Sequence, residues 1–418
     1  MLRSDRMQTF ARRGSVGDAE LGAVASSVVR AQNTALLLRM LWKERQMTRV
    51  DIAKRTGLSP STVSTIVSDL ERANIVQTLG AVASRGGRRP LLIGLRDDSF
   101  AQLGVEIGAR HVSAVLTDLR GRVLTFEERK HPVRTDPEGT LKVARDLIDD
   151  ALRRERFPTR KLLGIGVAVP SPVDTSLPGQ LSELIFPAWR GFDVREALSG
   201  YDVPVFVDND ANLGAVAEHW WGAGVDATEL IYVKVGAGVG AGYIIRGELY
   251  RGATGKAGEL GHVPIETNGP ECICGNHGCL TTLIGSEELS ERARVLFGLD
   301  EAPPLSEVIR RARAGDKLAR ELIDDVGERL GVVIGTLLNL LDVEIIIVGG
   351  EISSVGDMLL DSLRRTVRKR ALPSALAQTR IVTSNLGPRA IAVGAATLAL
   401  ASALANQQLV TGVVKGTS

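Results

Sequence analysis

The stretch TRVDIAKRTGLSPSTVSTIVSDLERANIV, residues 48–76, decides how the N-terminal part of this 418-residue chain folds. Thr48 can cap a short helix, and Gly57 supplies the positive φ that a sharp turn into a second helix needs. Ser59 is a good N-cap for that second helix, and Pro60 suits its first position. The spacing therefore predicts a helix-turn-helix.

The second predicted helix separates apolar side chains from small hydroxyl side chains. Its apolar stripe consists of Val63, Ile66, Val67 and Leu70. The other face carries Ser61, Thr62, Ser64, Thr65 and Ser68, with no acidic residue before Asp69. Such a face can approach a DNA groove and bond to phosphates or base edges. We expect Ser61, Thr62, Ser64 and Thr65 to contact DNA; the alternative is an ordinary amphipathic helix in a bundle.

The segments on either side complete this picture. Upstream, residues 33–46 have the apolar spacing of a helix, whereas residues 1–28 show no clear period and are expected to be a mobile extension. Downstream, residues 77–95 predict two short strands around a basic, glycine-rich tip. In a winged helix that tip lies beside the duplex, so Arg88 and Arg89 are expected to contact DNA. The alternative is a flexible basic linker.

Composition and charge restrict the class of protein. The chain is 44% hydrophobic and 24% charged, which is typical of a folded soluble protein. Residues 1–96 hold 16 Lys+Arg and 7 Asp+Glu, a formal charge of +9, which leaves −7 for residues 97–418. The basic end favours a polyanionic partner. Neither a membrane-spanning apolar run nor a secretory signal is evident, so we expect a cytoplasmic protein without a membrane partner.

From Ala101 onward, apolar strands alternate with helices and glycine turns, which predicts an α/β fold. Here the chain resembles the ROK family (repressor, open reading frame, kinase), which joins bacterial sugar kinases to sugar-responsive regulators. The motifs that carry the resemblance, in order, are VPSPVD (169–174), DNDAN (208–212), GAGVGAG (236–242), AGELGH (257–262), CICGNHGC (272–279), VGGEI (348–352) and GPRAIAVGAA (387–396). The resemblance implies a two-lobed, actin-like ATPase (ribonuclease H-like, sugar kinase) domain.

Together these observations predict an α/β chain with an N-terminal winged helix-turn-helix followed by the two-lobed domain. The expected parts are a mobile extension (1–28), the winged helix-turn-helix (29–96), lobe 1 (97–218), lobe 2 with a metal loop (219–385), a C-terminal return to lobe 1 (386–405) and a tail (406–418).

All three cysteines lie within eight positions, as Cys272, Cys274 and Cys279. Clustered thiols in a reducing compartment indicate metal ligands, and three thiolates with one imidazole satisfy tetrahedral zinc. His262 and His277 are both candidates for the fourth ligand, and three unligated thiols are the remaining alternative. The ROK resemblance favours His262, because its counterpart in the family is a zinc ligand. A site with four protein ligands leaves no position for water, so the predicted Zn²⁺ is structural.

The resemblance also assigns the parts of a kinase site. Asp210 matches the catalytic base, and Asn209, Glu259 and His262 match residues that contact the sugar. The phosphate side differs from the family pattern: the first loop reads Glu106–Arg110 in place of an Asp-x-Gly-x-Thr type loop, and the second, Gly236–Gly242, lacks its threonine. Loss of phosphate donors in both loops removes charge stabilisation from the transferring group.

The sugar side differs as well. Thr281 occupies the position of a glutamate that binds a sugar hydroxyl in the kinases, and Ser171 replaces a glycine. A shorter neutral hydroxyl cannot bond in the same way. The pocket is therefore expected to take a different sugar, a sugar phosphate or no ligand, in which last case Asn209, Asp210 and Glu259 are polar groups of the scaffold.

The sequence thus predicts a transcriptional regulator, expected to be a repressor of carbohydrate-related genes, rather than an enzyme. Its partners would be a double-stranded DNA operator and a sugar or sugar-phosphate effector, and it would act as a homodimer or homotetramer. Asp210 would be a relic of the base. The alternatives are an ATP-dependent carbohydrate kinase with an attached DNA-binding domain, and a constitutive DNA-binding protein with an inactive sensor.

Overall fold

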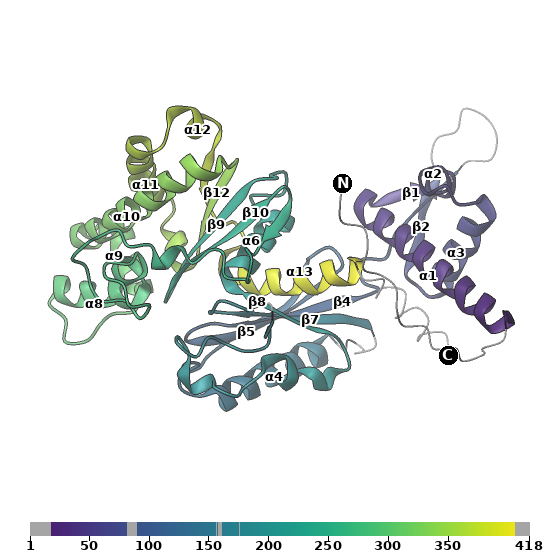
Figure 1. Cartoon of the computed structure of the whole chain (residues 1–418), viewed down its shortest axis with the longest axis horizontal. Helices are drawn as coiled ribbons and strands as arrows, with labels where there is room; N and C mark the ends of the chain where they lie inside the picture. Colours follow the sequence, from purple (N-terminus) through teal and green to yellow (C-terminus); the bar gives the residue numbers. More distant parts are fainter. Residues whose placement is uncertain (1–17, 82–89, 156, 158–160, 175, 406–418) are drawn as a thin grey trace, which may run out of the picture. The chain divides into compact units, whose positions relative to one another are not determined.

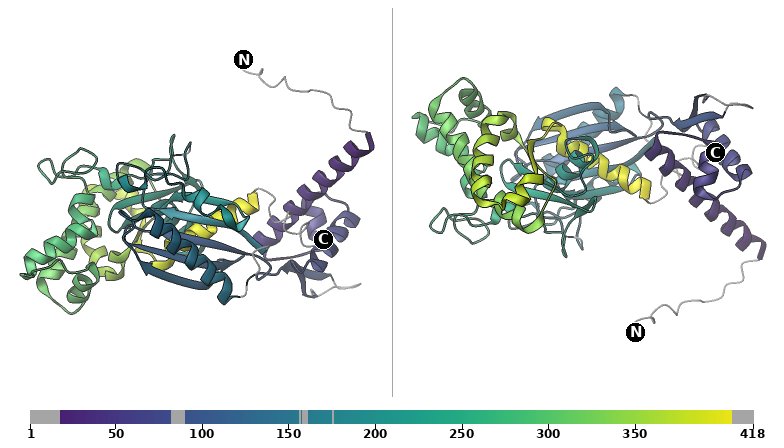
Figure 2. Two further views of the ribbon diagram at one scale, coloured as in Figure 1. Left: turned by 90° about the horizontal axis from the view of Figure 1, so that it is seen from below. Right: turned by 90° about the horizontal axis from the view of Figure 1, so that it is seen from above.

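The computed structural model describes residues 18–81, 90–155, 157, 161–174 and 176–405, and side chains from residue 29 onward. Contacts divide the chain into two compact units, one formed by Met1–Arg96 with Leu404–Ser418 and the other by Asp97–Ala403. We refer to them as unit 1 and unit 2. Figures 1 and 2 show their secondary structure from three sides.

Unit 1 contains α1 (Asp18–Glu44), β1 (Gln46–Thr48), α2 (Arg49–Thr56), α3 (Pro60–Arg72), β2 (Val76–Ala81) and β3 (Leu91–Leu95). Helix α1 begins at Asp18, inside the segment for which no regular element was expected. Thr48 caps α2 in a reciprocal capping box with Asp51, and Gly57 ends the helix with φ 72°. Ser59 caps α3, with Pro60 in its first turn. The local capping chemistry therefore sets the helix-turn-helix as the sequence predicts.

A three-stranded antiparallel sheet in the order β1-β3-β2 completes unit 1. Strands β2 and β3 are the two strands predicted around the basic tip. Residues 82–89, which include Arg88 and Arg89, lie outside the described residues. Inside the unit, buried side chains from α1, α2, α3 and β3 include Leu38, Leu41, Ile52, Ile66 and Ile93. Apolar contact among these elements supplies the stability that such short helices lack alone.

Unit 2 is built on two five-stranded sheets, which confirms the two-lobed α/β fold. The first has the order β6-β5-β4-β7-β8, from β4 (Ala101–Ile107), β5 (His111–Asp118), β6 (Val123–Lys130), β7 (Leu162–Val169) and β8 (Val205–Asn209). The second has the order β11-β10-β9-β12-β13, from β9 (Leu230–Val235), β10 (Val239–Ile245), β11 (Glu248–Tyr250), β12 (Ile345–Gly349) and β13 (Arg380–Thr383). Each sheet defines one lobe of unit 2.

Helices cover both faces of each sheet. In lobe 1, α4 (Pro137–Arg154) packs on one face, and the C-terminal helix α13 (Ala390–Ala405) lies along the other (Figure 1). In lobe 2, α6 (Asp210–Trp221) packs on one face of β9 and β10. The opposite face is covered by α7 (Thr281–Ile284), α8 (Ser286–Phe297), α9 (Leu305–Arg313), α10 (Lys317–Leu341) and α11 (Asp357–Arg370). Two short helices, α5 (Val194–Ala197) and α12 (Pro373–Gln378), lie in loops.

Helix α13 approaches its neighbours so closely that only glycine fits at the contacts. A Cβ at Gly104 would lie 1.9 Å from the Ala392 carbonyl oxygen, and a Cβ at Gly394 would lie 1.8 Å from that of Leu213 on α6. Within the described residues, 387–405 is also the one helical segment long and apolar enough to cross a membrane, by length and composition only. Of its most apolar window, 67% is buried, so its apolar composition is explained by the core of unit 2.

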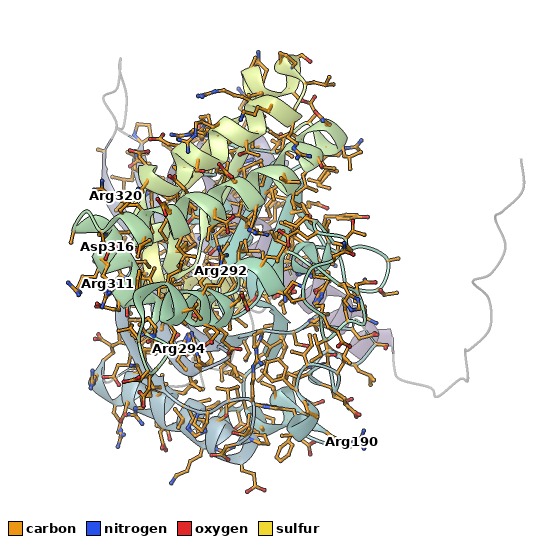
Figure 3. All side chains as sticks on the ribbon, turned by 90° about the vertical axis from the view of Figure 1, so that its left-hand side faces the viewer. Arg190, Arg292, Arg294, Arg311, Asp316 and Arg320 are labelled. Carbon is orange, nitrogen blue, oxygen red and sulfur yellow. The ribbon has the colours of Figure 1, made fainter. Side chains whose placement is uncertain are left out.

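Charged side chains lie along the helices of lobe 2, among them Arg294 on α8 and Arg311 on α9 (Figure 3). Arg294 pairs with Glu291 on α8, and Arg311 on α9 lies over the Phe297 ring at 4.5 Å while pairing with Glu307. Asp316 caps α10. These are local surface contacts, each worth little alone.

Candidate functional site

The predicted DNA-contacting face lies on α3 in unit 1. Ser61, Ser64, Thr65 and Ser68 are exposed and Thr62 is half-buried. The opposite stripe is buried, with Val63, Ile66, Val67 and Leu70 each at most 3% exposed. The first turn of α3 contains no acidic residue. The helix thus presents hydroxyl side chains and a positive N-terminal dipole end, a combination that suits a phosphate-rich partner.

Hydrogen bonds arrange these hydroxyls. The Ser59 Oγ lies 2.8 Å from both the Ser61 Oγ and the Thr62 Oγ1, and the Thr65 Oγ1 donates to the Ser61 carbonyl at 3.0 Å. A hydroxyl can accept as well as donate, so each still has capacity for a bond to DNA. The exposed edge of α3 is therefore polar and small.

In unit 2 the three cysteines and His262 lie together. One ligand atom from each residue falls within 4.8 Å of every other, and His277 does not belong to this group. The 3-10 turn Leu260–His262 supplies the imidazole, while the loop 272–279 supplies the thiols. Gly275 and Gly278 have φ of 90° and 63°, which permit the tight turn. The fold thus brings together the four residues that sequence spacing and family resemblance select.

The geometry of this cluster fits tetrahedral zinc. The Cys272 Sγ lies 3.4 Å from the His262 Nδ1, and the Cys274 and Cys279 Sγ atoms are 3.7 Å apart. Zn–S bonds of about 2.3 Å and Zn–N bonds of about 2.0–2.1 Å place tetrahedral ligand atoms roughly 3.5–3.8 Å apart. Burial raises the pKa of the Cys279 thiol to about 12, a cost that a metal would offset by binding the thiolate. The donor set and spacing therefore match a Cys₃His zinc centre.

A cavity of about 140 Å³ lies between the two sheets of unit 2. Its lining includes the four predicted effector residues, together with Ser171 and Thr281, the two positions that depart from the kinase pattern. The other lining residues are Ala109, Arg134, Pro170, Pro172, Ile185, Phe186, Lys234, Ala237, Gly238, Val239, Gly240, Gly258 and Ile273. The fold therefore gathers Asn209, Asp210, Glu259 and His262 at one cavity, as the resemblance implies, and adds Lys234 and Arg134.

Lys234 changes the chemistry of the cavity, because its ammonium forms an ion pair with the Asp210 carboxylate. Asp210 begins α6 directly after β8 of lobe 1, and Lys234 lies on β9, the lobe 2 strand on which α6 packs. The side chains are only 6% and 15% exposed. Burial lowers the pKa of Lys234, but the Asp210 and Glu106 carboxylates outweigh it and hold that pKa above its usual value. The position of the kinase base is thus tied to an internal cation.

Two side chains of the first phosphate loop, Glu106–Arg110, also have partners within the protein. The buried Glu106 carboxylate lies 3.3 Å from the His111 Nε2, and Arg110 donates to the Ser286 Oγ at 3.1 Å. Ser286 begins α8, and its backbone N–H bonds to the Gly236 carbonyl at 2.8 Å. Burial lowers the pKa of His111, but the hydrogen bond and charge of Glu106 raise it overall. Glu106 thus binds His111, and Arg110 binds Ser286, at the loop that matches the first phosphate loop of the kinases.

The remaining polar residues have structural partners. Asn209 caps α6, since its Oδ1 accepts from the Ala211 and Asn212 N–H groups, and its Nδ2 donates to the Ser171 carbonyl at 3.2 Å. The Ser171 Oγ accepts from the Ser182 N–H at 2.9 Å, which explains a hydroxyl there. Burial, with help from the Asp210 charge, raises the pKa of Glu259 to about 7. Glu259 and Lys234, like Asp210 and His262, are therefore ionisable groups with a shifted pKa that line the cavity.

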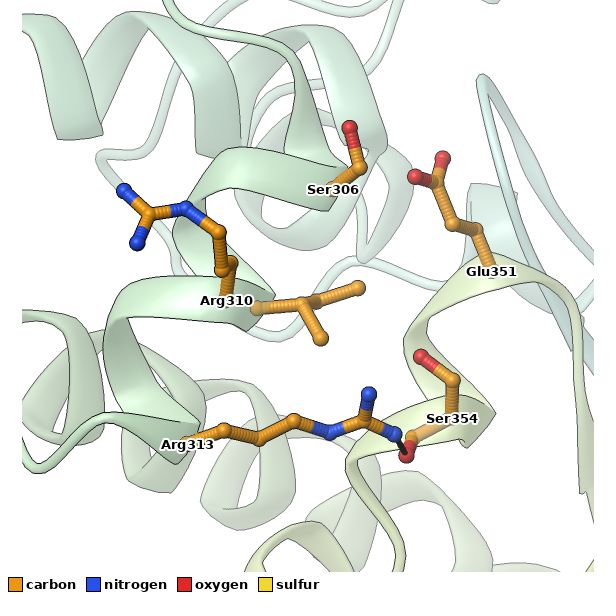
Figure 4. A pocket seen from close by; sticks show the side chains of 6 residues that line it. Ser306, Arg310, Arg313, Glu351 and Ser354 are labelled. Carbon is orange, nitrogen blue, oxygen red and sulfur yellow. Dashed lines mark hydrogen bonds between the residues drawn. The ribbon is translucent and has the colours of Figure 1, made fainter.

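A second cavity, about 230 Å³ in volume, lies on lobe 2 between α9 and the turn Glu351–Val355 (Figure 4). It is lined by Ser306, Ile309, Arg310, Arg313, Glu351 and Ser354. Arg313 donates to the Ser354 carbonyl, and Arg310 pairs with Glu307. Both guanidinium groups thus stabilise local structure, and the cavity between the sheets remains the better candidate for a ligand site.

Comparison with protein families matches both units. Residues 102–402 match the ROK family, and residues 32–77 match a winged helix-turn-helix DNA-binding family. A putative xylose repressor from Caldicellulosiruptor sp. (strain Rt8B.4) is 31% identical over 91% of this chain and 98% of its own length. The DNA-binding transcriptional dual regulator NagC of Escherichia coli (strain K12) is 31% identical over 91% of this chain and 94% of its own.

Solved structures show the same two kinds of relative. A ROK family transcriptional regulator, a homologue of the E. coli MLC protein, superposes with a TM-score of 0.75 at 25% identity, over 93% of this chain and 99% of its own. A ROK family glucokinase from Streptomyces griseus, in complex with glucose and AMPPNP, superposes with a TM-score of 0.63 at 28% identity, over 71% of this chain and 98% of its own. The regulators thus match nearly the whole chain, and the kinase matches a smaller share.

Proposed function

The chain belongs to the ROK family, and from this premise we propose that it is a DNA-binding transcriptional repressor of carbohydrate-related genes. The observation that carries the proposal is the exposed hydroxyl face of α3, which has no acidic side chain in its first turn and belongs to a winged helix-turn-helix. Relatives named putative xylose repressor and N-acetylglucosamine repressor support the same function.

The proposed contacts divide between bases and phosphates. Ser61, Thr62, Ser64 and Thr65 reach base edges or phosphates in the major groove. Arg88 and Arg89 hold the backbone or enter the minor groove from the wing. Helix-turn-helix proteins commonly read two half-sites as dimers, so we place the active form as a homodimer or homotetramer in the cytoplasm.

Operator binding is expected to weaken steeply with salt. Full-length protein incubated with fragmented genomic DNA should retain specific fragments, and a retained fragment serves as the operator in fluorescence anisotropy. A protein that contacts six to ten phosphates loses about 10³–10⁵ in affinity between 50 and 200 mM salt. A retained fragment whose affinity is insensitive to salt, or failure to retain any fragment, would contradict the proposal.

The second part of the proposal concerns the cavity between the lobes. We assign it to a sugar or sugar-phosphate effector and not to catalysis. Asp210 is bound to Lys234, and Arg110 is bound to Ser286 near the glycine turn, so neither the base nor the phosphate side is free to act. A carbohydrate held between the lobes would change their closure, and through it the spacing of paired α3 helices.

Carbohydrate is expected to stabilise the protein without causing ATP consumption. A ligand at about one hundred times its dissociation constant adds ~2.7 kcal/mol to the free energy of unfolding. A panel of sugars and sugar phosphates, read by melting temperature and by a coupled ADP assay on the same samples, should give a thermal shift and no ADP above the sugar-free rate. Brisk sugar-dependent ADP release would favour the kinase alternative. Operator binding with no thermal shift from any sugar would favour the constitutive DNA-binding alternative.

We further propose that Zn²⁺ occupies the cluster of Cys272, Cys274, Cys279 and His262. The donor set and spacing support this assignment, and four protein ligands suit a structural role. His262 also lines the cavity, so the metal would fix the orientation of its ring there. The zinc loop would thus hold one wall of the effector site.

A further inference from the structure

A single lysine interrupts the otherwise apolar strand β9, whose sequence is LIYVKV. Its neighbours Val233 and Val235 are buried, and Lys234 itself points to the cavity between the lobes. Burying an ammonium is costly unless a charge compensates it. The fold provides that charge in the Asp210 carboxylate. The pair belongs to the proposed effector site, although the sequence analysis gives Lys234 no role.

The Lys234 ammonium also lies close to the glycine turn of the second phosphate loop, Gly236–Gly242. A Cβ at Gly236 would be 3.3 Å from the Lys234 Cε and 3.8 Å from its Nζ. The Ser286 N–H holds the same turn through the Gly236 carbonyl, and Arg110 holds Ser286. Lys234 thus lies close both to the glycine turn, which matches a phosphate loop, and to Asp210, which matches the base at the sugar.

Two carboxylates share this cation. Besides Asp210, the buried Glu106 on β4 interacts electrostatically with Lys234, and His111 faces Glu106 from the next strand. The Asp210 and Glu259 carboxylates line the cavity, and such oxygen ligands, together with water, are those that a divalent cation prefers. In this cavity the positive charge beside Asp210 is instead the ammonium of a side chain, Lys234.

We propose that Lys234 is a resident counter-cation, which takes the place of a divalent metal ion in this cleft and lets it bind carbohydrate without metal or nucleotide. This inference rests on the proposed carbohydrate-sensing function. An ammonium has three N–H donors, and Asp210 takes one of them. The others are available to a ligand hydroxyl at the end of the cavity formed by Asn209 and Asp210. Lys234 thus positions Asp210 as a hydrogen-bond acceptor and keeps it from acting as a base.

Binding of Mn²⁺ tests the proposal without knowledge of the effector. Electron paramagnetic resonance of zinc-loaded, full-length protein titrated with Mn²⁺ should show the free-ion signal for the parent. Lys234→Met leaves Asp210 without its ion-pair partner, and should bind Mn²⁺ at least about tenfold more tightly than the parent, since one nearby positive charge is removed. Lys234→Arg keeps the charge and should behave as the parent does.

Lys256→Met is the matched control, because Lys256 pairs with Asp174 at a more exposed position of unit 2. It should leave Mn²⁺ binding unchanged. Specific Mn²⁺ binding by the parent at this cleft would overturn the proposal. This measurement uses the parent protein alone, so it does not depend on whether a variant folds. Equal Mn²⁺ affinities for the parent and a folded Lys234→Met would also overturn it. Operator binding measured on the same samples reports separately on the proposed function, since Lys234 lies outside unit 1.

Discussion

Thr65→Glu is expected to abolish specific DNA binding while leaving the fold intact. Thr65 is exposed on α3, and its hydroxyl bonds only to the Ser61 carbonyl among the hydrogen bonds described for it. A carboxylate at this position would face phosphate, and like charges in contact cost several kcal/mol. We therefore expect the affinity for operator DNA to fall by about 100-fold or more, as measured by fluorescence anisotropy at fixed salt.

A threonine of unit 2 provides the control. Thr336 on α10 is also exposed, and its hydroxyl donates to the carbonyl four residues before it, at 3.2 Å. Thr336→Glu adds the same charge to the same kind of helical site, and should leave operator affinity within about twofold of the parent. Equal losses from both substitutions would show that net charge, and not the face of α3, governs binding. An unchanged affinity in Thr65→Glu would exclude α3 as the DNA-contacting helix.

Cys279→Ser is expected to release the metal and to lower the stability of unit 2. Cys279 is fully buried and pairs with Pro264, and the next residue, Leu280, lies in the core of lobe 2. Structural zinc contributes about 10–16 kcal/mol of apparent binding free energy in small domains. If a third of that energy stabilises unit 2, the loss of ~4 kcal/mol lowers the melting temperature by roughly 6 °C for a unit of this size. Elemental analysis should give one zinc per chain in the parent and none in the variant.

His277→Ala distinguishes between the two candidate histidines. His277 is exposed and outside the cluster, so this variant should keep one zinc and the parent melting temperature. His262→Ala should lose the metal as Cys279→Ser does. Retention of full zinc by Cys279→Ser, or its loss in His277→Ala, would mean that the ligand set is wrong.

Local motifs in the sequence predict much of unit 1 and of the metal cluster. The caps at Thr48 and Ser59, the positive φ at Gly57 and the apolar stripe of α3 depend on residues a few positions apart, so pattern alone specifies them. Cysteine spacing also limits the ligand set, although the choice of His262 over His277 needed the family resemblance. The start of α1 at Asp18 was not predicted, because residues 18–28 have no apolar period.

Contacts between lobes could not be predicted in the same way. Lys234 reaches Asp210 only because β9 lies beside α6, and Arg110 reaches Ser286 across 176 positions of sequence. In the sequence, the one local sign of this ion pair is a lysine within an apolar strand. From sequence alone, such a lysine would be placed at the exposed edge of a sheet. The family motifs likewise identified Asp210 as the base position without revealing that a cation neutralises it.

The close packing of α13 also bears on which positions of unit 2 can change. At Gly104, Gly166 and Gly394 the neighbouring group is main chain, and a notional Cβ would lie within 2 Å of a carbonyl oxygen in each case. No side-chain rearrangement elsewhere can relieve such an overlap, so these three positions do not tolerate substitution of the glycine. The cavity lining, by contrast, is drawn from loops, strand ends and the first residues of α6 and α7. Substitutions that alter the cavity are therefore expected in its lining, while the glycines against α13 are expected to stay unchanged.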